Sequence, residues 1–237
     1  MLTRVQAMAA LLLQARAGGP LVDAAREPGP ADPEEMYRVQ DLVLRAIANG
    51  ERPGAWKAIP PRPGTEAAAS PVPARHVVTS PAKLVAGRQL LGVEAEIAFR
   101  LGTDLQPEEA LVLIELCETR LADWGTASSL WKLADFQSNA ALIVGTGTRA
   151  WREIDFSAQA VELVVNGRQA KRAVGTHPAK NPSNLIPWML GHCAARGGLQ
   201  AGDIIATGSW VGIVKVEPGD QIVARFPGIG EAHLSLQ

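Results

Sequence analysis

The sequence is poor in cysteine, in surplus charge and in long hydrophobic runs. Its 237 residues include only two cysteines, Cys117 and Cys193, which excludes a disulfide framework and offers no metal-finger spacing. No apolar run approaches the roughly 18 to 20 residues that a membrane span needs. The 23 Lys and Arg residues balance 24 Asp and Glu residues, so the basic surplus typical of nucleic-acid proteins is missing. These absences predict a cytoplasmic protein that binds neither membrane nor nucleic acid.

The first 50 residues predict two helices. The segment up to Ala17 also imitates a short secretory signal, but its apolar run is short and Arg16 lies inside the supposed cleavage triplet. An amphipathic helix is therefore the favoured interpretation. The second helix has a strong start signal, with a capping Asp32, Pro33 at the first helical position and Glu35 three residues after the cap.

Strand-like patterns dominate the rest of the chain and predict an α+β fold. Proline and glycine cluster over 53–81, which indicates an irregular connection or short edge strands. We therefore expect a small helical N-terminal region with this connection, 1–85, followed by a β-rich, metal-binding catalytic domain, 86–237. The predicted elements are strands at 93–99, 111–117, 203–207, 211–216 and 221–226, a hairpin at 161–168 with an Asn166-Gly167 turn, a short helix start at 107–110, a helix over 182–196, and plain turns at 145–147 and 207–209.

Glu94 and Glu96 are the sequence feature that most clearly indicates a functional site. Residues two apart on a strand point to the same face, so both carboxylates project together from apolar flanks. Neighbouring carboxylates repel unless a cation neutralises them or one binds a proton. Oxygen ligands of this kind suit Mg²⁺, Mn²⁺ or Ca²⁺. The alternative is that the pair simply faces solvent.

Two further residues are candidates for the same site. Glu115 is an isolated carboxylate in an apolar strand and needs a partner, although Glu118, nearer a polar turn, is a rival. Lys57 has apolar neighbours, so it can serve in acid/base chemistry or bind a substrate carboxylate. The alternative is an ordinary surface lysine. The four histidines show no ligand spacing; His177 is predicted in a turn and His192 on a helix surface.

Several segments together resemble the hydratase branch of the fumarylacetoacetate hydrolase superfamily, which includes 2-keto-4-pentenoate hydratases and 4-oxalocrotonate decarboxylases. The segments are Gly54-Ala55-Trp56-Lys57, Val93-Glu94-Ala95-Glu96-Ile97-Ala98, Ile114-Glu115, Arg120-Leu121-Ala122-Asp123-Trp124, Asn181-Pro182, Ala201-Gly202-Asp203, Thr207-Gly208-Ser209, Pro218-Gly219-Asp220 and Phe226-Pro227-Gly228-Ile229-Gly230. The resemblance implies a mainly β catalytic domain with a small helical N-terminal part, in a homo-oligomer.

The resemblance also implies a site and a reaction. Glu94, Glu96 and Glu115 would hold Mg²⁺ or Mn²⁺ on a short 2-oxo acid. Lys57 would orient the substrate or move a proton, and the segment Thr207, Gly208 and Ser209 would bind the substrate's acid end. The expected activity is that of a metal-dependent lyase that hydrates 2-hydroxypenta-2,4-dienoate-like compounds. Decarboxylation of a 4-oxalocrotonate-type acid, C–C hydrolysis of an acylpyruvate and a weakly active accessory subunit are the alternatives.

Two departures from the family pattern bear on the reaction. Between the lysine and the Glu-x-Glu strand, the family's hydratases commonly carry an acidic residue. Here the only acidic residue in the segment 64–85 is Glu66. The family's Asp-Asn-Ala-Ser is replaced by Ser138-Asn139-Ala140-Ala141. If the missing groups handle the proton or the water, the substrate or the preferred reaction changes.

Overall fold

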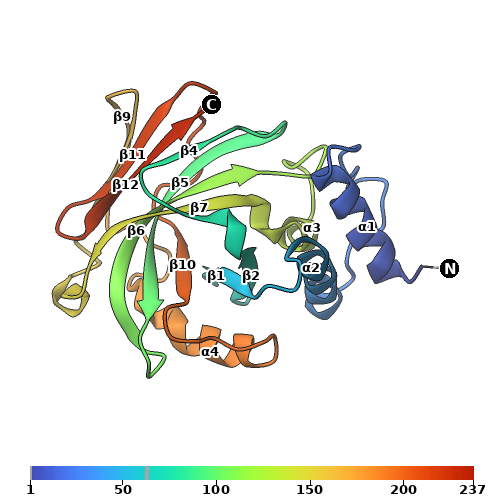
Figure 1. The fold of residues 1–237 in the computed structure, drawn as a ribbon, viewed down its shortest axis with the longest axis horizontal. Coiled ribbons are helices and arrows are strands. Elements are labelled where there is room, and N and C mark those ends of the chain that lie inside the picture. Colours follow the sequence, from blue (N-terminus) through green and yellow to red (C-terminus); the bar gives the residue numbers. More distant parts are fainter. Residues whose placement is uncertain (1, 62–63) are drawn as a thin grey trace.

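The computed structural model describes residues 2–61 and 64–237, and its strands form two sheets beside a helical end (Figure 1). The helices are α1 (Arg4–Arg16), α2 (Pro33–Ile47), α3 (Ser129–Ala134) and α4 (Ile186–Ala194), with short 3-10 turns η1 (Ala74–His76), η2 (Phe136–Ser138), η3 (Trp151–Glu153) and η4 (Pro182–Leu185). The strands are β1 (Pro53–Ile59), β2 (Ala68–Pro73), β3 (Val77–Thr79), β4 (Ala82–Leu84), β5 (Leu90–Leu101), β6 (Pro107–Glu118), β7 (Asn139–Thr148), β8 (Ala160–Val165), β9 (Arg168–Val174), β10 (Ile204–Ser209), β11 (Gln221–Phe226) and β12 (Gly230–Leu236). Within the described ranges, no helix is long and apolar enough to span a bilayer.

The N-terminal helices begin where their capping residues predict. The Thr3 side chain accepts a hydrogen bond from the Gln6 backbone, and the Gln6 side chain accepts one from the Thr3 backbone, which forms a capping box. Asp32 accepts the Glu35 backbone N–H at 2.8 Å. Both helices, α3 and the turn η2 share a hydrophobic cluster at one end of the molecule (Figure 1). The predicted pair of helices is confirmed.

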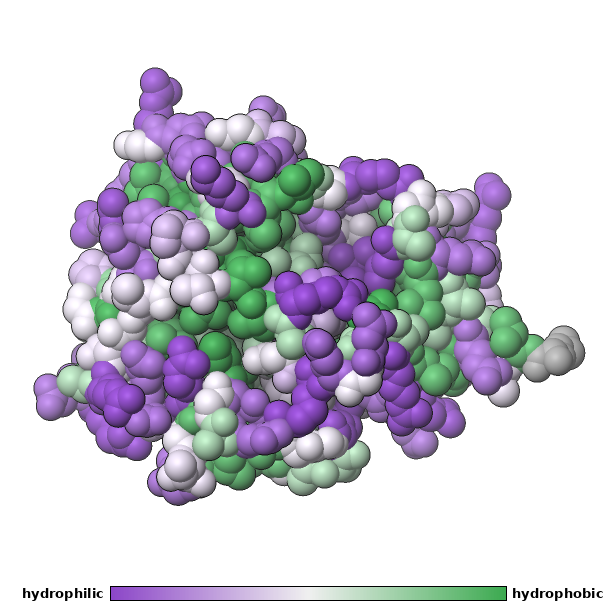
Figure 2. All heavy atoms as spheres, in the orientation of Figure 1, coloured by the Kyte–Doolittle hydropathy of each residue, from purple (hydrophilic) through white to green (hydrophobic). Residues whose placement is uncertain are grey.

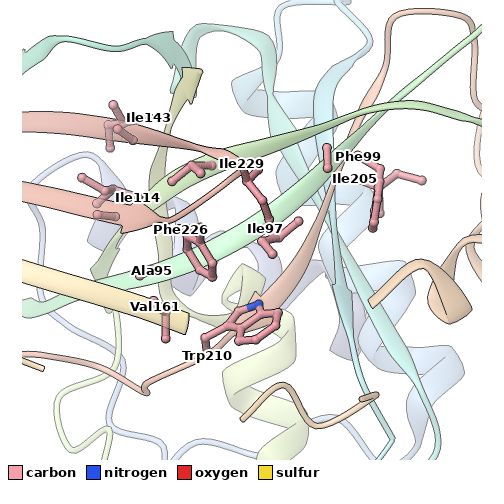
Figure 3. Close-up of a cluster of buried hydrophobic side chains, with 14 of the residues drawn as sticks. Ala95, Ile97, Phe99, Ile114, Ile143, Val161, Ile205, Trp210, Phe226 and Ile229 are labelled. Atoms are coloured by element: carbon pink, nitrogen blue, oxygen red, sulfur yellow. The ribbon is translucent and has the colours of Figure 1, made fainter. Parts of the chain in front are cut away.

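The strands form a seven-stranded sheet of order β2-β1-β10-β5-β6-β7-β3 and a five-stranded sheet of order β4-β12-β11-β8-β9. The hydrophobic core fills the space between them, where Ile97 and Ile114 of the larger sheet meet Phe226 of the smaller (Figure 3). Trp210 packs edge-on against Phe226 with ring centroids 5.3 Å apart. On the outer face drawn in Figure 2, hydrophobic side chains gather toward the middle and hydrophilic ones surround them.

Alternation along the strands gives the larger sheet a second, chemically different face. Odd-numbered residues of β5, such as Ile97, enter the core between the sheets, whereas Glu94 and Glu96 point the opposite way. On this opposite face a smaller buried cluster includes Ala98, Leu113 and Ala206. The candidate site therefore lies on the face that does not pack against the five-stranded sheet.

The segment before residue 85 contributes to the same sheet. β1 is an inner strand that pairs in parallel with β10 and antiparallel with β2, whereas β2 and β3 are the two edges of this sheet and β4 is an edge of the smaller sheet, as the alternative of short edge strands predicted. The predicted irregular connection is thus wrong for β1, and the strand framework crosses the expected boundary between 1–85 and 86–237. That two-part division stays a prediction. Arg62 and Pro63 of the expected connection lie outside the described residues.

Three local predictions were wrong. Pro107 starts strand β6 rather than a helix, because proline is tolerated at the first position of a strand. Residues 211–216 make only an isolated bridge between Val214 and Val93, and Gly212, with φ of 71°, turns the chain away. Residues 145–147 belong to β7 rather than to a plain turn. The hairpin with positive φ at Asn166 (51°) and Gly167 (75°) is confirmed.

Gly145 of β7 lies directly against the backbone of β12 in the other sheet. A Cβ at this position would lie 2.1 Å from the Glu231 carbonyl oxygen. Gly145→Ala is therefore expected to lower the free energy of unfolding by about 1 to 3 kcal/mol, measured by urea denaturation. In contrast, a Cβ at Gly191 in α4 meets nothing within 4 Å, so Gly191→Ala should be neutral or stabilising. Equal effects of the two substitutions would contradict this packing.

Candidate metal and substrate site

Three glutamates and a lysine from three strands meet on the second face of the large sheet. Glu94 of β5 and Glu115 of β6 are direct cross-strand partners, and Glu96 lies two residues along β5 on the same face. Lys57 reaches the cluster from β1, and its Nζ contacts Glu115 Oε1. Glu96, Glu115 and Lys57 are buried, with at most 4% of each residue exposed. These charged groups are therefore held in a poorly solvated place.

The electrostatics of the cluster fit a bound cation. Burial, and then the charge of Glu115, raise the pKa of Glu96 well above its usual value. Burial alone would lower the pKa of Lys57, but Glu115 and Glu96 outweigh it and raise that pKa above its usual range. One buried oxygen of each acid, Glu96 Oε1 and Glu115 Oε2, has no hydrogen-bond partner among the described residues. The cluster thus has three carboxylates and one ammonium, and two of the carboxylate oxygens are unsatisfied. Such a donor set suits Mg²⁺ or Mn²⁺.

Groups outside the predicted set complete the surroundings. Ligand atoms of Glu94, Glu115 and Cys117 lie within 4.8 Å of one another, a group that does not include Glu96. Asn139 Nδ2 donates to Glu115 Oε1 at 2.9 Å, and the Gln137 carbonyl accepts from Lys57 Nζ at 3.4 Å. Cys117 lies two residues after Glu115, so a period of two along the strand could have identified it.

The turn η2 has a strained backbone and brings the Gln137 carbonyl to the site. Phe136, Gln137 and Ser138 all have positive φ, at 56°, 53° and 61°, an uncommon conformation for non-glycine residues. Asp135 anchors the turn, because it is fully buried and accepts from the Arg120 backbone N–H at 2.9 Å. Ser138 Oγ is buried without a hydrogen-bond partner in the described part of the chain. Such strain, held in place by a buried ion pair, is typical of functional sites.

A cavity of about 930 Å³ opens onto Glu94 and Cys117. Its walls combine apolar and aromatic side chains with several polar ones. The lining residues include Met36, Tyr37, Pro60, Glu66, Trp124, Leu130, Lys132, Leu133, Gln137, Ser138, Trp188 and His192. His192 stacks on Trp188 with ring centroids 4.8 Å apart. The shape and lining suit a small planar acid whose polar end meets the carboxylate cluster.

His192 belongs to the cavity wall, so its predicted place on an open helix surface was wrong. Burial, and then the charge of Arg196, lower the pKa of His192 to about 4. An unfolded chain binds that proton near pH 6.5, so stability is expected to fall as pH drops from about 6.5 toward 4. His192→Gln should flatten this part of a thermal-unfolding profile, whereas His233→Gln, at the surface beside Glu231, should not. An unchanged slope in the His192 variant would contradict a half-buried imidazole that stays neutral.

The segment 207–209 supports the acids directly. The Gly208 N–H donates to Glu96 Oε2 at 2.9 Å, and the Thr207 hydroxyl donates to the Ile97 carbonyl at 2.6 Å. Ser209 Oγ accepts the Gly212 N–H at 2.9 Å. The segment is part of strand β10, not the plain turn expected. A role for these residues in substrate binding stays a prediction.

Two other side chains lie elsewhere. Glu118, the rival of Glu115, accepts the Gly87 N–H at 2.5 Å. It lines a different cavity, which Leu116 lines as well. His177, predicted in a turn, lies just before the turn at Pro178 and is buried, with Nε2 2.8 Å from the Thr207 carbonyl oxygen. It therefore contacts β10 at the 207–209 segment and is not available to solvent.

Comparison with known proteins identifies the family. Residues 43–236 match the family described as fumarylacetoacetate (FAA) hydrolase, C-terminal. The chain belongs to this family. The fumarylacetoacetate hydrolase fold predicted from the sequence is confirmed, and so is the hydratase and decarboxylase branch.

Named relatives of the chain are 2-keto-4-pentenoate hydratases, and solved structures share its fold. The chain is 28% identical to 2-keto-4-pentenoate hydratase 1 of Dechloromonas aromatica (strain RCB), over 97% of this chain and 95% of that protein. It is 30% identical to the 2-keto-4-pentenoate hydratase of Paraburkholderia phymatum over 61% of this chain and 60% of that protein. Among solved structures, this fumarylacetoacetate hydrolase family member is similar to 4-oxalocrotonate decarboxylase from Pseudomonas putida G7, complexed with magnesium and adipate. The TM-score is 0.86 at 20% identity, covering 100% and 99% of the two chains.

Proposed function

We propose that this protein is a divalent-metal-dependent lyase that hydrates a 2-hydroxypenta-2,4-dienoate-like acid. The observation that carries the proposal is the carboxylate cluster, of which Glu94 lines an aromatic cavity while the buried Glu96 and Glu115 each have an unsatisfied oxygen among the described residues. The likeness to proteins named 2-keto-4-pentenoate hydratase, over nearly the whole chain, supports the same substrate class.

Glu94, Glu96 and Glu115 would hold Mg²⁺ or Mn²⁺. When bound, such a cation acts as a Lewis acid that stabilises negative charge on the C2 oxygen of a 2-oxo acid. The carboxylates present fit this role, because two of the three are buried and each of these two has an unpartnered oxygen. A similar structure, the fumarylpyruvate hydrolase from Pseudomonas aeruginosa (TM-score 0.53, 17% identity), is complexed with Mn²⁺ and pyruvate.

Lys57 supplies a positive charge and a proton at the same place. Its raised pKa keeps the amine protonated, so it would orient the substrate carboxylate and give up a proton during ketonisation, not act as a free base. The Gln137 carbonyl and Glu115 fix the direction of its Nζ. Lys57 is therefore the residue we assign to the proton transfer.

The cavity walls would position the rest of the substrate and the water. Trp124, Trp188 and Tyr37 present flat apolar surfaces to an unsaturated chain. Glu66 lines the same cavity, although it is the only acidic residue in 64–85. Glu66 and the Ser138 hydroxyl, which has no hydrogen-bond partner among the described residues, are the groups we assign to bind the water that adds to the distal carbon.

Decarboxylation of a 2-oxo diacid is the second candidate, and one residue favours it. Lys132 lines the cavity, with its Nζ 4.5 Å from the ring centroid of Trp124, and could bind a second, distal carboxylate. Lys132→Met is then expected to raise the KM for a diacid without changing the KM for a monoacid. Equal KM values with and without Lys132 would remove this candidate.

Turnover assays with purified protein test the proposal. We expect 2-hydroxypenta-2,4-dienoate to be consumed with Mg²⁺ or Mn²⁺ present and not with EDTA, with 4-hydroxy-2-oxo acid as product. Release of carbon dioxide from a 4-oxalocrotonate-type acid would favour the second candidate. Metal binding without turnover of either acid would contradict both and favour an accessory subunit. The proposal includes a cytoplasmic homo-oligomer that serves the catabolism of aromatic compounds.

A further inference from the structure

Cys117 lies where a metal ligand would lie, although its side chain is of a different chemical type from the three carboxylates. It is 2% exposed and stands on β6 two residues after Glu115, so both side chains point to the same face. Its Sγ is within 4.8 Å of carboxylate oxygens of Glu94 and Glu115. It also lines the 930 Å³ cavity beside Glu94, which gives a ligand or ion access to the sulfur.

A second observation points to a cation at this position. Glu115 is fully buried, and its Oε2 has no hydrogen-bond partner among the described residues. The sulfur itself has only a long contact, 4.0 Å, with the Glu115 carbonyl oxygen. A thiol and an unsatisfied carboxylate oxygen on the same face therefore both lack a strong partner that a metal ion would provide.

We propose that Cys117 is a ligand of the metal site and makes it a mixed carboxylate–thiolate centre. On binding, the thiol loses its proton to solvent and the thiolate sulfur joins the carboxylate oxygens. Thiolate favours borderline and soft ions, so the site takes Zn²⁺, Co²⁺ or Cd²⁺ more tightly, relative to Mg²⁺, than carboxylates alone would. This inference rests on the proposed metal site. The competing explanation is that Cys117 only fills apolar space in the cavity wall.

Cobalt spectroscopy tests the inference without relying on activity. Co²⁺ titrated into the metal-free protein is expected to produce a near-ultraviolet sulfur-to-metal charge-transfer band at one ion per chain. Cys117→Ala should lose this band, while Cys193→Ala should keep it. Cys193 is the matched control because it is the only other cysteine and is also buried. Calorimetry should show Cd²⁺ affinity reduced about tenfold or more in Cys117→Ala, with Mg²⁺ affinity little changed.

The outcomes separate this inference from the proposed function. Co²⁺ binding by calorimetry without a charge-transfer band in the unsubstituted protein would overturn the thiolate ligand and leave the carboxylate site standing. A band that persists in Cys117→Ala would also overturn it. Failure of Co²⁺, Mn²⁺ and Mg²⁺ to bind at all would contradict both the thiolate ligand and the proposed function.

Discussion

The Lys57→Met protein is expected to lose about 3 kcal/mol of its free energy of unfolding in the absence of metal, because a buried carboxylate is left without its partner. Lys57 Nζ contacts Glu115 Oε1, and both residues are almost completely buried. The same substitution removes a positive charge from the cluster, so Mn²⁺ should bind at least as tightly as before and restore the lost stability. Turnover should fall about 100-fold or more, because the proton donor is gone.

Urea denaturation with and without Mn²⁺ measures this effect. Lys132→Met is the control, since Lys132 lines the same cavity but lies over Trp124 rather than against a buried acid. It should change the free energy of unfolding by less than about 1 kcal/mol. Equal small losses in both variants would contradict a stabilising ion pair between Lys57 and Glu115.

The Glu96→Gln protein is expected to bind Mn²⁺ about 100-fold more weakly and yet to be more stable than the unsubstituted protein when no metal is present. Glu96 is fully buried, and its pKa is raised well above the usual value by burial and by Glu115. Glutamine has no acid group to ionise beside Glu115, and its amide oxygen can still accept the Gly208 N–H. The stability gain follows because, in the metal-free state, a buried acid beside Glu115 must either bear an unpaired charge or bind a proton, and both cost free energy.

Manganese titration and chemical denaturation of the same sample measure both effects. Glu118→Gln is the control, because Glu118 lines another cavity and binds the Gly87 N–H. We expect unchanged Mn²⁺ affinity in that variant. A Glu96→Gln protein that binds Mn²⁺ normally would show that Glu96 is not a ligand. A Glu118→Gln protein that loses Mn²⁺ would move the site to the other side of β6.

Some of the site could be predicted from local periodicity. A repeat of two places Glu94 and Glu96 on one face of a strand, but it cannot say whether that face is buried or exposed. The answer comes from the register between β5 and β6, which pairs Glu94 with Glu115. The register between distant strands depends on packing across the whole sheet, so the sequence of either strand alone does not determine it.

Long-range contacts explain most of what was missed. Lys57 enters the site because β1 pairs with β10, whose residues lie almost 150 positions later in the chain. Because the sequence after β1 is rich in proline, the pattern did not predict an inner strand there. His192 has the pattern of a helix surface, and the approach of Tyr37 from α2, at 4.7 Å between ring centroids, and of Trp56 from β1 places it in a cavity wall. The capped helices were predictable because their signals are local.

Calorimetric titration of oxalate tests the central claim of a metal-dependent 2-oxo acid site most directly, because oxalate resembles the planar enolate of pyruvate. We predict binding of oxalate with Mg²⁺ or Mn²⁺ present and none in EDTA, at one oxalate per chain. Binding of equal strength with and without metal, or no binding with either metal, would contradict the account. In that case Glu94, Glu96 and Glu115 would not form a working metal site.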